Sequence, residues 1–307
     1  MSQMASITPT LSVGGTGIAN WIRRHSLVTY FVLAYVLTWV TTLPLVLSQR
    51  GLGIVNLPET LLLVLLLLAT YIGPLPAAFI VTGIVEGKAG VKQLLRRMGQ
   101  WRVGIGWYLL VLIAYPLIFL LGASAYMGVA PFTALLQKWP VLFTAYLPTA
   151  LIGILYPSLG EEPGWRGFAL PRLQQQHGPL VGSLILGVLH GFWHFPAYFL
   201  PGFILPGRFD PVAFAANTCA IIVMTVTWTW LFNRSNGSVL LIMLVHGASN
   251  AVSGLFPQLL PTNTPDDQWF IFKVMGVVAL LIIICTRGKL GYRPPVEPTA
   301  SEPARTF

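Results

Sequence analysis

Residues 26–47 read SLVTYFVLAYVLTWVTTLPLVL, a run without a charged side chain. An α-helix needs roughly 20 apolar residues to cross the hydrocarbon core of a bilayer, which is about 30 Å thick. The run is too long for the apolar core of a signal peptide, and no small-residue cleavage site follows it. We therefore expect it to form a transmembrane helix that the mature protein retains.

Seven more apolar runs of this kind follow along the chain. Of the 307 residues, 55% are hydrophobic and only 9% are charged, whereas soluble domains carry about 25% charged residues. The runs are too long and too uniformly apolar to be the alternating strands of a barrel. The sequence thus predicts an all-α, polytopic membrane protein of about eight transmembrane helices, over residues 26–47, 59–85, 103–127, 140–160, 179–200, 212–232, 237–257 and 269–286.

The basic residues indicate how these helices are oriented. With eight spans, fourteen of the 18 lysines and arginines fall on the side of the two termini, and only Arg50, Lys138, Arg208 and Lys273 fall on the other. Cytoplasmic loops of membrane proteins carry the excess of basic residues. We therefore expect a multi-pass protein of the plasma (cytoplasmic) membrane with both termini in the cytoplasm. The net charge of +9 then reflects orientation in the lipid bilayer, and no nucleic acid partner is predicted.

The spans divide the chain into five segments. We expect a cytoplasmic tail over 1–25, N-terminal transmembrane helices over 26–139, a core over 140–257, a last transmembrane helix over 258–291 and a proline-rich, disordered tail over 292–307. The basic stretch 86–102 suits a short interfacial helix, although topology alone explains its charge. Cys219 and Cys285 lie in apolar runs and indicate neither a disulfide framework nor a four-cysteine metal site.

Three groups of ionisable or polar residues lie in or beside the apolar runs, where a charge costs roughly 2.5–3.5 kcal/mol on insertion scales. The first is Glu161, Glu162 and Arg166 at the end of the fourth span. In a helix Arg166 lies one turn beyond Glu162 and can pair with it. Glu161 points about 100° away and is left free for acid–base chemistry. The structural alternative is a charged helix cap at the membrane surface.

The second group is His190 and His194, and the third is His246 and Asn250. Both pairs are spaced i, i+4, so their members share a helix face. The two histidines suit metal binding or proton transfer, or are packing residues; no glutamate lies between them as in the His-Glu-x-x-His zinc motif. His246 and Asn250 enclose small residues, which allow a close helix neighbour. They could stabilise an oxyanion together or only bond two helices.

The position of His194 conflicts with a straight fifth helix. The fourth span ends on the cytoplasmic side and the seventh begins there, whereas the fifth runs away from it. Gly191 and Pro196 would permit a broken or tilted fifth helix that brings the three groups together.

In this order, the three groups resemble the motifs of the CAAX protease and bacteriocin-processing (Abi) family of intramembrane proteases, which includes the Ras-converting CAAX prenyl endopeptidases. Glu161, Glu162 and Arg166 match Glu-Glu-x-x-x-Arg, and His246 and Asn250 match His-x-x-x-Asn. The motif Phe-x-x-x-His matches at His194, with histidine at its aromatic position. A second register, Leu186 to His190, also lacks the phenylalanine; the Trp-His-Phe-Pro context favours His194. The resemblance covers roughly residues 140–257.

The resemblance implies a helical membrane fold with a polar cavity inside the bilayer. It further implies that Glu161 and His194 activate a water, that His246 and Asn250 stabilise the oxyanion, and that Glu162 with Arg166 holds the first motif in place. Zinc bound by Glu161, His194 and His246 and a metal-free glutamate mechanism are both compatible with the family. We prefer the metal-free version, because no ligand pair has the compact spacing of familiar zinc motifs.

The sequence therefore predicts a membrane-embedded endopeptidase of the CAAX prenyl protease type. Its substrate would be a peptide or membrane protein, lipidated or not, that enters laterally from the bilayer. One alternative is a non-catalytic immunity or scaffold protein that binds a peptide in the same cavity. The other is a transporter, which would show interrupted helices in both halves of the chain. Here the ionisable residues concentrate in the second half.

Overall fold

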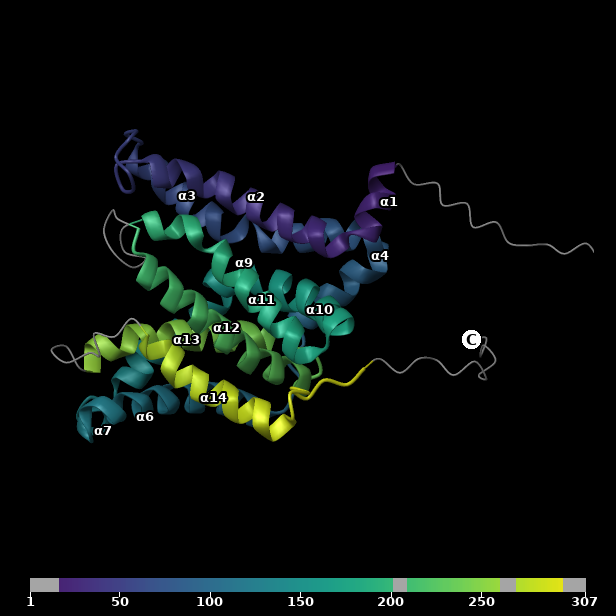
Figure 1. Ribbon diagram of the computed structural model, residues 1–307. Helices are drawn as coiled ribbons and strands as arrows, with labels where there is room; N and C mark the ends of the chain where they lie inside the picture. The colour runs from purple at the N-terminus through teal and green to yellow at the C-terminus, as the bar shows by residue number, and fades with distance from the viewer. Residues whose placement is uncertain (1–16, 201–208, 260–268, 295–307) are drawn as a thin grey trace, which may run out of the picture.

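The computed structural model describes residues 17–200, 209–259 and 269–294. All named elements within these ranges are helices, and they pack side by side into an elongated bundle (Figure 1). The short helix α1 and the C-terminal end of α14 lie at the same end of this bundle (Figure 1). Most of the two predicted tails, residues 1–16 and 295–307, lies outside the described residues.

The first half of the chain forms apolar helices. It also forms a short helix that the sequence did not predict, α1, within the segment expected to be a tail. Its elements are α1 (Gly17–Arg24), α2 (Ser26–Leu47), α3 (Glu59–Tyr71), α4 (Pro74–Met98), α5 (Ile105–Leu109), π-helical η1 (Leu110–Ala114), α6 (Tyr115–Met127) and α7 (Ala130–Gln137). Helices α3 and α4 are bent by 44° and together form the predicted span 59–85. A second kink at Gly87, with φ of 64°, separates this span from the basic end of α4, which is helical to Met98.

The second half contains one long interrupted helical run followed by four further helical spans. The run comprises π-helical η2 (Leu142–Tyr146), α8 (Leu147–Gly153), π-helical η3 (Ile154–Ser158), α9 (Leu159–Glu162), π-helical η4 (Pro163–Ala169) and α10 (Leu170–His177). It is followed by α11 (Pro179–Trp193), the 3₁₀-helix η5 (Phe195–Phe199), α12 (Pro211–Arg234), α13 (Val239–Leu259) and α14 (Phe270–Thr286).

Two expectations about the helix ends have different outcomes. The fourth span was predicted to end at residue 160, but the helical run continues to His177, so Glu161 and Glu162 lie within it rather than at its end. The fifth helix is broken, one of the two arrangements that Gly191 and Pro196 would permit. Helix α11 ends at Trp193, and the chain continues as the short η5 with Pro196 in its first turn.

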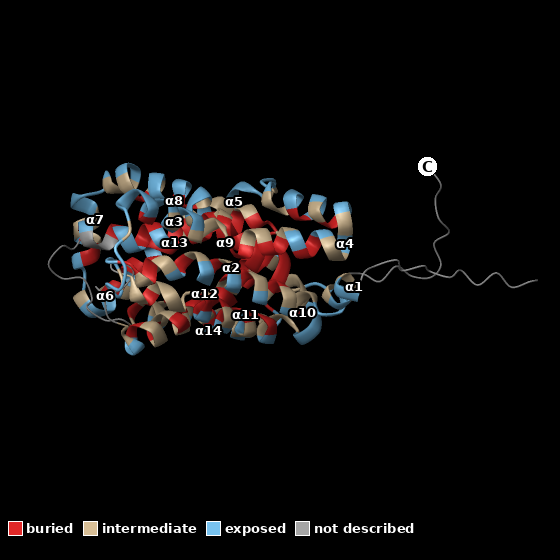
Figure 2. Ribbon diagram, turned by 90° about the horizontal axis from the view of Figure 1, so that it is seen from above, coloured by how far each residue is buried: buried red, intermediate tan, exposed pale blue. Residues whose placement is uncertain are grey.

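The apolar helices coincide with the eight predicted spans. Within the described residues, five helical runs are long and apolar enough to cross a membrane, the bent pair of α3 and α4 adds a sixth, and α13 and α14 contain shorter apolar helices. The outer face of α14 exposes Val277, Leu280, Leu281 and Ile284, one apolar stripe at helical spacing. Figure 2 shows exposed residues along the outward faces of the bundle and buried ones around α9 at its centre. These features confirm a polytopic all-α membrane protein.

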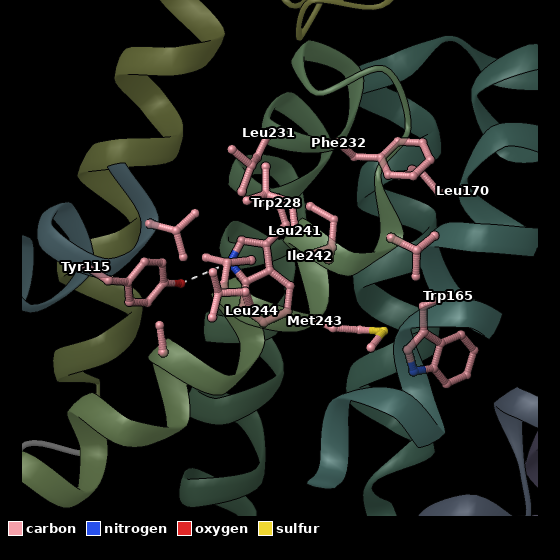
Figure 3. Close-up of a cluster of buried hydrophobic side chains, with 14 of the residues drawn as sticks. Tyr115, Trp165, Leu170, Trp228, Leu231, Phe232, Leu241, Ile242, Met243 and Leu244 are labelled. Atoms are coloured by element: carbon pink, nitrogen blue, oxygen red, sulfur yellow. Dashed lines mark hydrogen bonds between the residues drawn. The ribbon is translucent and has the colours of Figure 1, made fainter. Parts of the chain in front are cut away.

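A cluster of large buried side chains holds α6, α12 and α13 together at the centre of the bundle. Trp228 of α12 lies among residues of α13 that include Leu241 and Leu244, and its indole Nε1 donates to the Tyr115 hydroxyl at 3.0 Å (Figure 3). Trp165 lies on the other side of the same region (Figure 3). Tyr115 thus provides an acceptor for the buried indole of Trp228 from a distant part of the sequence.

Helices α8 and α13 contact each other through their backbones. A Cβ built on Gly247 would lie 2.4 Å from the carbonyl oxygen of Ala150 and 3.1 Å from the Cα of Gly153. Only glycine fits at such a distance, as at the small-residue contacts of other membrane helices. This contact fixes the position of His246, the residue that precedes Gly247.

We expect Gly247→Ala to lower the thermal stability of the protein in detergent, because the added methyl forces α8 and α13 apart at a cost of about 1–3 kcal/mol. The matched control is Gly254→Ala on the same helix, where an added Cβ meets no atom within 4 Å. This variant should unfold at or above the wild-type temperature. Equal unfolding temperatures for the two variants would contradict the backbone contact.

Candidate active site

The two adjacent carboxylates of the first motif are buried. Glu161 is 5% exposed and Glu162 is fully buried, so they do not form a charged cap at the membrane surface. They end α9, and the π-helical turn η4 that follows carries Arg166 back over them. Because burying an unpaired charge is costly, each carboxylate must have partners in the bundle.

Glu162 pairs with Arg166, as the helical spacing predicts. Nη1 of Arg166 lies 3.1 Å from each carboxylate oxygen of Glu162. Nη2 of Arg166 donates to the hydroxyl of Thr225 at 3.1 Å, and its guanidinium carbon lies 4.9 Å from the centre of the Trp228 ring. Both additional partners belong to α12, so Arg166 joins the first motif to a helix that carries none of the three motifs.

Glu162 also contacts the third motif. Its Oε1 lies 2.8 Å from Nδ1 of His246 on α13. The carboxylate therefore accepts from Nδ1 of the imidazole and directs the other ring nitrogen, Nε2, away from itself. This hydrogen bond orients His246, while the next turn of α13 presents Asn250.

Glu161 contacts the second motif through His190. Its Oε2 lies 2.9 Å from His190 Nε2, while His190 Nδ1 lies 3.5 Å from Arg166 Nη1. The Trp165 ring covers the imidazole of His190, with ring centres 5.0 Å apart. A guanidinium can only donate, so His190 Nδ1 is the acceptor and Nε2 carries the proton that Glu161 accepts.

His194, the residue preferred from the motif context, lies one turn further along. It caps the end of α11, and its Nδ1 lies 3.0 Å from the carbonyl oxygen of His190. Ligand atoms of Glu161, His190 and His194 all lie within 4.8 Å of one another. Both histidines therefore belong to the site, but the direct hydrogen bond to Glu161 is made by His190.

A polar cavity of about 150 Å³ contains these groups. The predicted residues Glu161, Arg166, His194, His246 and Asn250 line it, whereas Glu162 lies behind them as the common partner of Arg166 and His246. The broken fifth helix brings the histidines of α11 to the same point as α9 and α13. The intramembrane polar cavity that the sequence predicts is therefore present.

An apolar channel of about 520 Å³ adjoins the polar cavity. Glu161, His194, His246 and Asn250 line both spaces. The remaining channel wall comes from α2, α3, η3, the end of α11 and η5 with the residue that follows it. Most of this wall is apolar or small: Leu45, Leu66, Ala69, Pro157, Trp193, Pro196, Ala197 and Leu200. The candidate site therefore has a polar side and an apolar side.

Three residues of the site were not found from the sequence. Thr225 and Trp228 hold Arg166, and Asn217 lines the polar cavity. Thr225 and Trp228 are ordinary residues of an apolar helix, and nothing in the one-dimensional pattern distinguishes them. Asn217 offered a signal, because an amide in a membrane span needs a polar partner.

The site offers two groups of donors for a metal ion. One is Glu161, His190 and His194, and the other is Glu161, Glu162 and His246. The first group matches the two imidazoles and one carboxylate that hold catalytic zinc while leaving a position for water. His190 Nε2, which a metal at the first group would use, is the nitrogen that lies 2.9 Å from Glu161, while Nδ1 faces Arg166, so a metal there would replace the hydrogen bond between His190 and Glu161.

Comparison with known proteins agrees with the three motifs. Residues 143–252 match the model of the family described as type II CAAX prenyl endopeptidase Rce1-like. The chain is also similar to a protein of Methanococcus maripaludis named CAAX prenyl protease 2, with 27% identity over 143 residues. This similarity covers 46% of the chain and 51% of the relative, so the chain spans about half the length of the curated relative it matches. The resemblance to the CAAX protease family is therefore confirmed for the segment that carries the motifs.

Removing the Arg166 charge alone should destabilise the protein strongly. In Arg166→Met, Glu162 keeps its buried charge without its arginine partner, which costs about 3–5 kcal/mol. The double variant Glu162→Gln/Arg166→Met removes both charges and should recover much of this loss, because the coupled pair is not additive. Thermal unfolding in detergent measures both. If the double variant is instead less stable than Arg166→Met, by as much as Glu162→Gln alone destabilises the wild type, the pairing is contradicted.

Proposed function

We propose that this chain is an intramembrane endopeptidase of the CAAX prenyl protease type. The observation that carries the proposal is the arrangement of Glu161, His194, His246 and Asn250, which line both a polar cavity and an apolar channel. A base and two oxyanion-stabilising groups thus meet at the inner end of a space suited to an apolar substrate. The family match over residues 143–252 supports the same reaction class.

In the proposed reaction, Glu161 is the general base. It takes a proton from a water whose oxygen attacks the carbonyl carbon of the scissile peptide bond. His194 lies close enough to help position this water, since its ligand atom lies within 4.8 Å of that of Glu161. When the tetrahedral intermediate collapses, the C–N bond breaks and Glu161 returns the proton to the leaving amine nitrogen.

The oxyanion is stabilised by α13. The side-chain amide of Asn250 can donate in any state, whereas His246 can donate from Nε2 only as an imidazolium, because its Nδ1 proton is used by Glu162. Glu162 is the buried partner that a charged His246 needs, and such preorganised donors contribute strongly to catalysis.

The contacts of His190 support a positioning role and a metal-free reaction. His190 connects Glu161 to Arg166 and so holds the base in place, with the ring of His194 beside it at 5.1 Å between ring centres. Zinc, if it were bound by Glu161, His190 and His194, would supply an activated water in its open position. That arrangement would require His190 to give up its hydrogen bond to Glu161, so we favour Glu161 as the base.

The apolar channel supports a hydrophobic substrate that enters from the bilayer. Its wall is built by α2, α3 and η5, and α3 exposes Leu61, Leu63 and Leu67 on its outer face, where lipid would lie. The relative is named as a CAAX prenyl protease, which suggests a C-terminal lipidated peptide. An unmodified peptide or a membrane protein segment fits the same apolar wall. The distribution of basic residues predicts that both termini lie in the cytoplasm, and we propose that substrates come from that side.

The competing reading is a scaffold or immunity protein that binds a peptide without cleaving it. Binding needs the channel but neither a buried base nor an oxyanion donor, whereas this site contains both. A transporter is less well supported, because the buried ionisable side chains of the site all come from residues 161–246 rather than from both halves of the chain.

Cleavage by purified protein tests the proposal directly. We expect the wild type to cleave fluorogenic prenylated peptides in detergent, and Glu161→Gln to reduce the rate by about 100-fold or more because it removes the base. Asn250→Ala should reduce the rate by about 100-fold. Two further variants are measured in parallel. His194→Ala removes the histidine proposed to position the water, and His190→Ala removes the histidine proposed to hold Glu161 in place.

Two controls make this assay decisive. Each variant must retain the thermal unfolding profile of the wild type, and Gly254→Ala must retain its activity. Activity that is lost with a chelator and restored by zinc would replace the metal-free reaction with a metal-dependent one. If the wild type cleaves neither prenylated and unprenylated peptides nor a broad set of membrane proteins, the peptide-binding reading is favoured instead.

Narrowing the channel should reduce activity without touching the reacting groups. We expect Ala69→Trp to raise KM or abolish cleavage, because Ala69 lines the channel wall and an indole would fill part of its volume of about 520 Å³. The matched control is Leu63→Trp on the exposed face of the same helix. Equal kinetics of the two variants for prenylated peptides would show that the substrate does not use this channel.

A further inference from the structure

An arginine-rich groove lies outside the candidate active site, at the end of the bundle that carries α1 and the C-terminal end of α14 (Figure 1). It consists of two adjoining hollows of about 580 and 690 Å³, which share Gln93, Arg97 and Asn236. Its walls are the end of α4, the start of α10 and the turn between α12 and α13. Neither hollow shares a side chain with the polar cavity or the apolar channel.

The groove has a large excess of positive charge. Its arginines are Arg96, Arg97, Arg102, Arg172 and Arg293, whereas Glu86 is the one carboxylate among the described residues that line it. Glu86 is already engaged, because Arg172 forms an ion pair with it. Arg96, Arg97 and Arg102 belong to none of the ion pairs formed among the described residues. No carboxylate of the described residues therefore lies within ion-pair distance of these three guanidinium groups.

The groove is built to keep these groups in place. The Gln100 amide donates to the carbonyl oxygens of Ser235 and Asn236 at 3.3 and 3.4 Å, and the Gln100 carbonyl accepts from the Ser238 hydroxyl at 2.7 Å. These bonds fasten the end of α4 to the turn between α12 and α13. Gly237 in this turn has φ of +77°, and a Cβ built on it would lie 3.8 Å from Nε of Arg97.

Apolar side chains are exposed in and next to the segment that lines the groove. Trp101 lines the groove and is exposed, and the guanidinium of Arg102 lies 5.0 Å from the centre of its ring. Leu95 and Ile105, close to these residues in the sequence, are exposed as well. Exposed tryptophan beside arginine is typical of the level of lipid headgroups. A soluble anion would need only the arginines, whereas a lipid would also use these apolar side chains.

We propose that this groove binds the phosphate headgroup of an anionic phospholipid. Arginine forks match phosphate oxygens in geometry and charge, and basic pockets between helices on the cytoplasmic side of a membrane are suited to anionic headgroups. The acyl chains would lie along the exposed residues Leu95 and Ile105. The proposal concerns binding and holds whether or not the chain is a protease.

The bound headgroup would lie next to the backbone that carries the first motif. Arg97 donates to the Gly167 carbonyl at 3.4 Å, and Arg172 donates to the Phe168 carbonyl at 2.8 Å. Both carbonyls belong to η4, the turn that carries Arg166. A lipid phosphate that holds these two arginines would therefore stabilise η4 from its outer side.

Binding of fluorescently labelled phosphatidylglycerol to the full-length protein in neutral detergent tests the proposal. We expect saturable binding to the wild type, and affinity reduced on the order of tenfold in Arg96→Gln/Arg102→Gln, which removes two exposed charges from the groove. The matched control is Arg23→Gln/Arg24→Gln, which removes two charges from α1 outside the groove and should bind as the wild type does. Arg97→Gln, provided that it unfolds at the wild-type temperature, should also bind more weakly.

Competition identifies the source of the phosphate. Unlabelled phosphatidylglycerol should displace the probe, whereas phosphatidylcholine and inorganic phosphate should not. Equal loss of affinity in the groove variant and the α1 variant would overturn the site, because it would show attraction by overall charge. Displacement by phosphatidylcholine would overturn its selectivity, and displacement by inorganic phosphate would overturn the assignment to a lipid.

Discussion

The rest of the structure depends on the hydrogen bonds that the buried carboxylate of Glu162 accepts. It accepts from Arg166 one turn along its own helix and from His246 on α13. Arg166 then extends the connection to Thr225 of α12 and, through its Nη1, to His190 of α11. A charged side chain that is buried away from solvent is costly unless partners of this kind satisfy it. The helices that carry the three motifs are thus held in one arrangement by the partners that the buried side chains of Glu161, Glu162 and Arg166 require.

Much of the fold could be predicted from the sequence, because lipid imposes a strong and local rule. A run of about 20 apolar residues must be a helix wherever it lies in the chain, and all eight predicted runs are helical. The end of the fourth span was wrong because Gly160 to Ala169 is polar enough to resemble a loop. Within the bundle, these polar groups bond to one another, so the helix continues where hydropathy predicts its end.

The site was predictable in its residue types but not in all of its contacts. The i, i+4 spacing predicts the bond between Glu162 and Arg166, which is local. It does not predict which histidine reaches Glu161, because the choice between His190 and His194 depends on how α11 packs against α9. Thr225 and Trp228 could not be found either, since their importance comes from a partner that lies about 60 residues earlier in the chain.

The backbone contact between Gly153 and Gly247 divides the surroundings of the substrate into two kinds of wall. Where α13 meets α8 there is no side chain to shorten, lengthen or rotate, so His246 and Asn250 stay at a set depth whatever occupies the cavity. On the opposite side, the helices α2 and α3 and the segment η5 present side chains of varied size. Substitutions on α2, α3 and η5 can therefore change which substrate fits, while α13 keeps His246 and Asn250 in place.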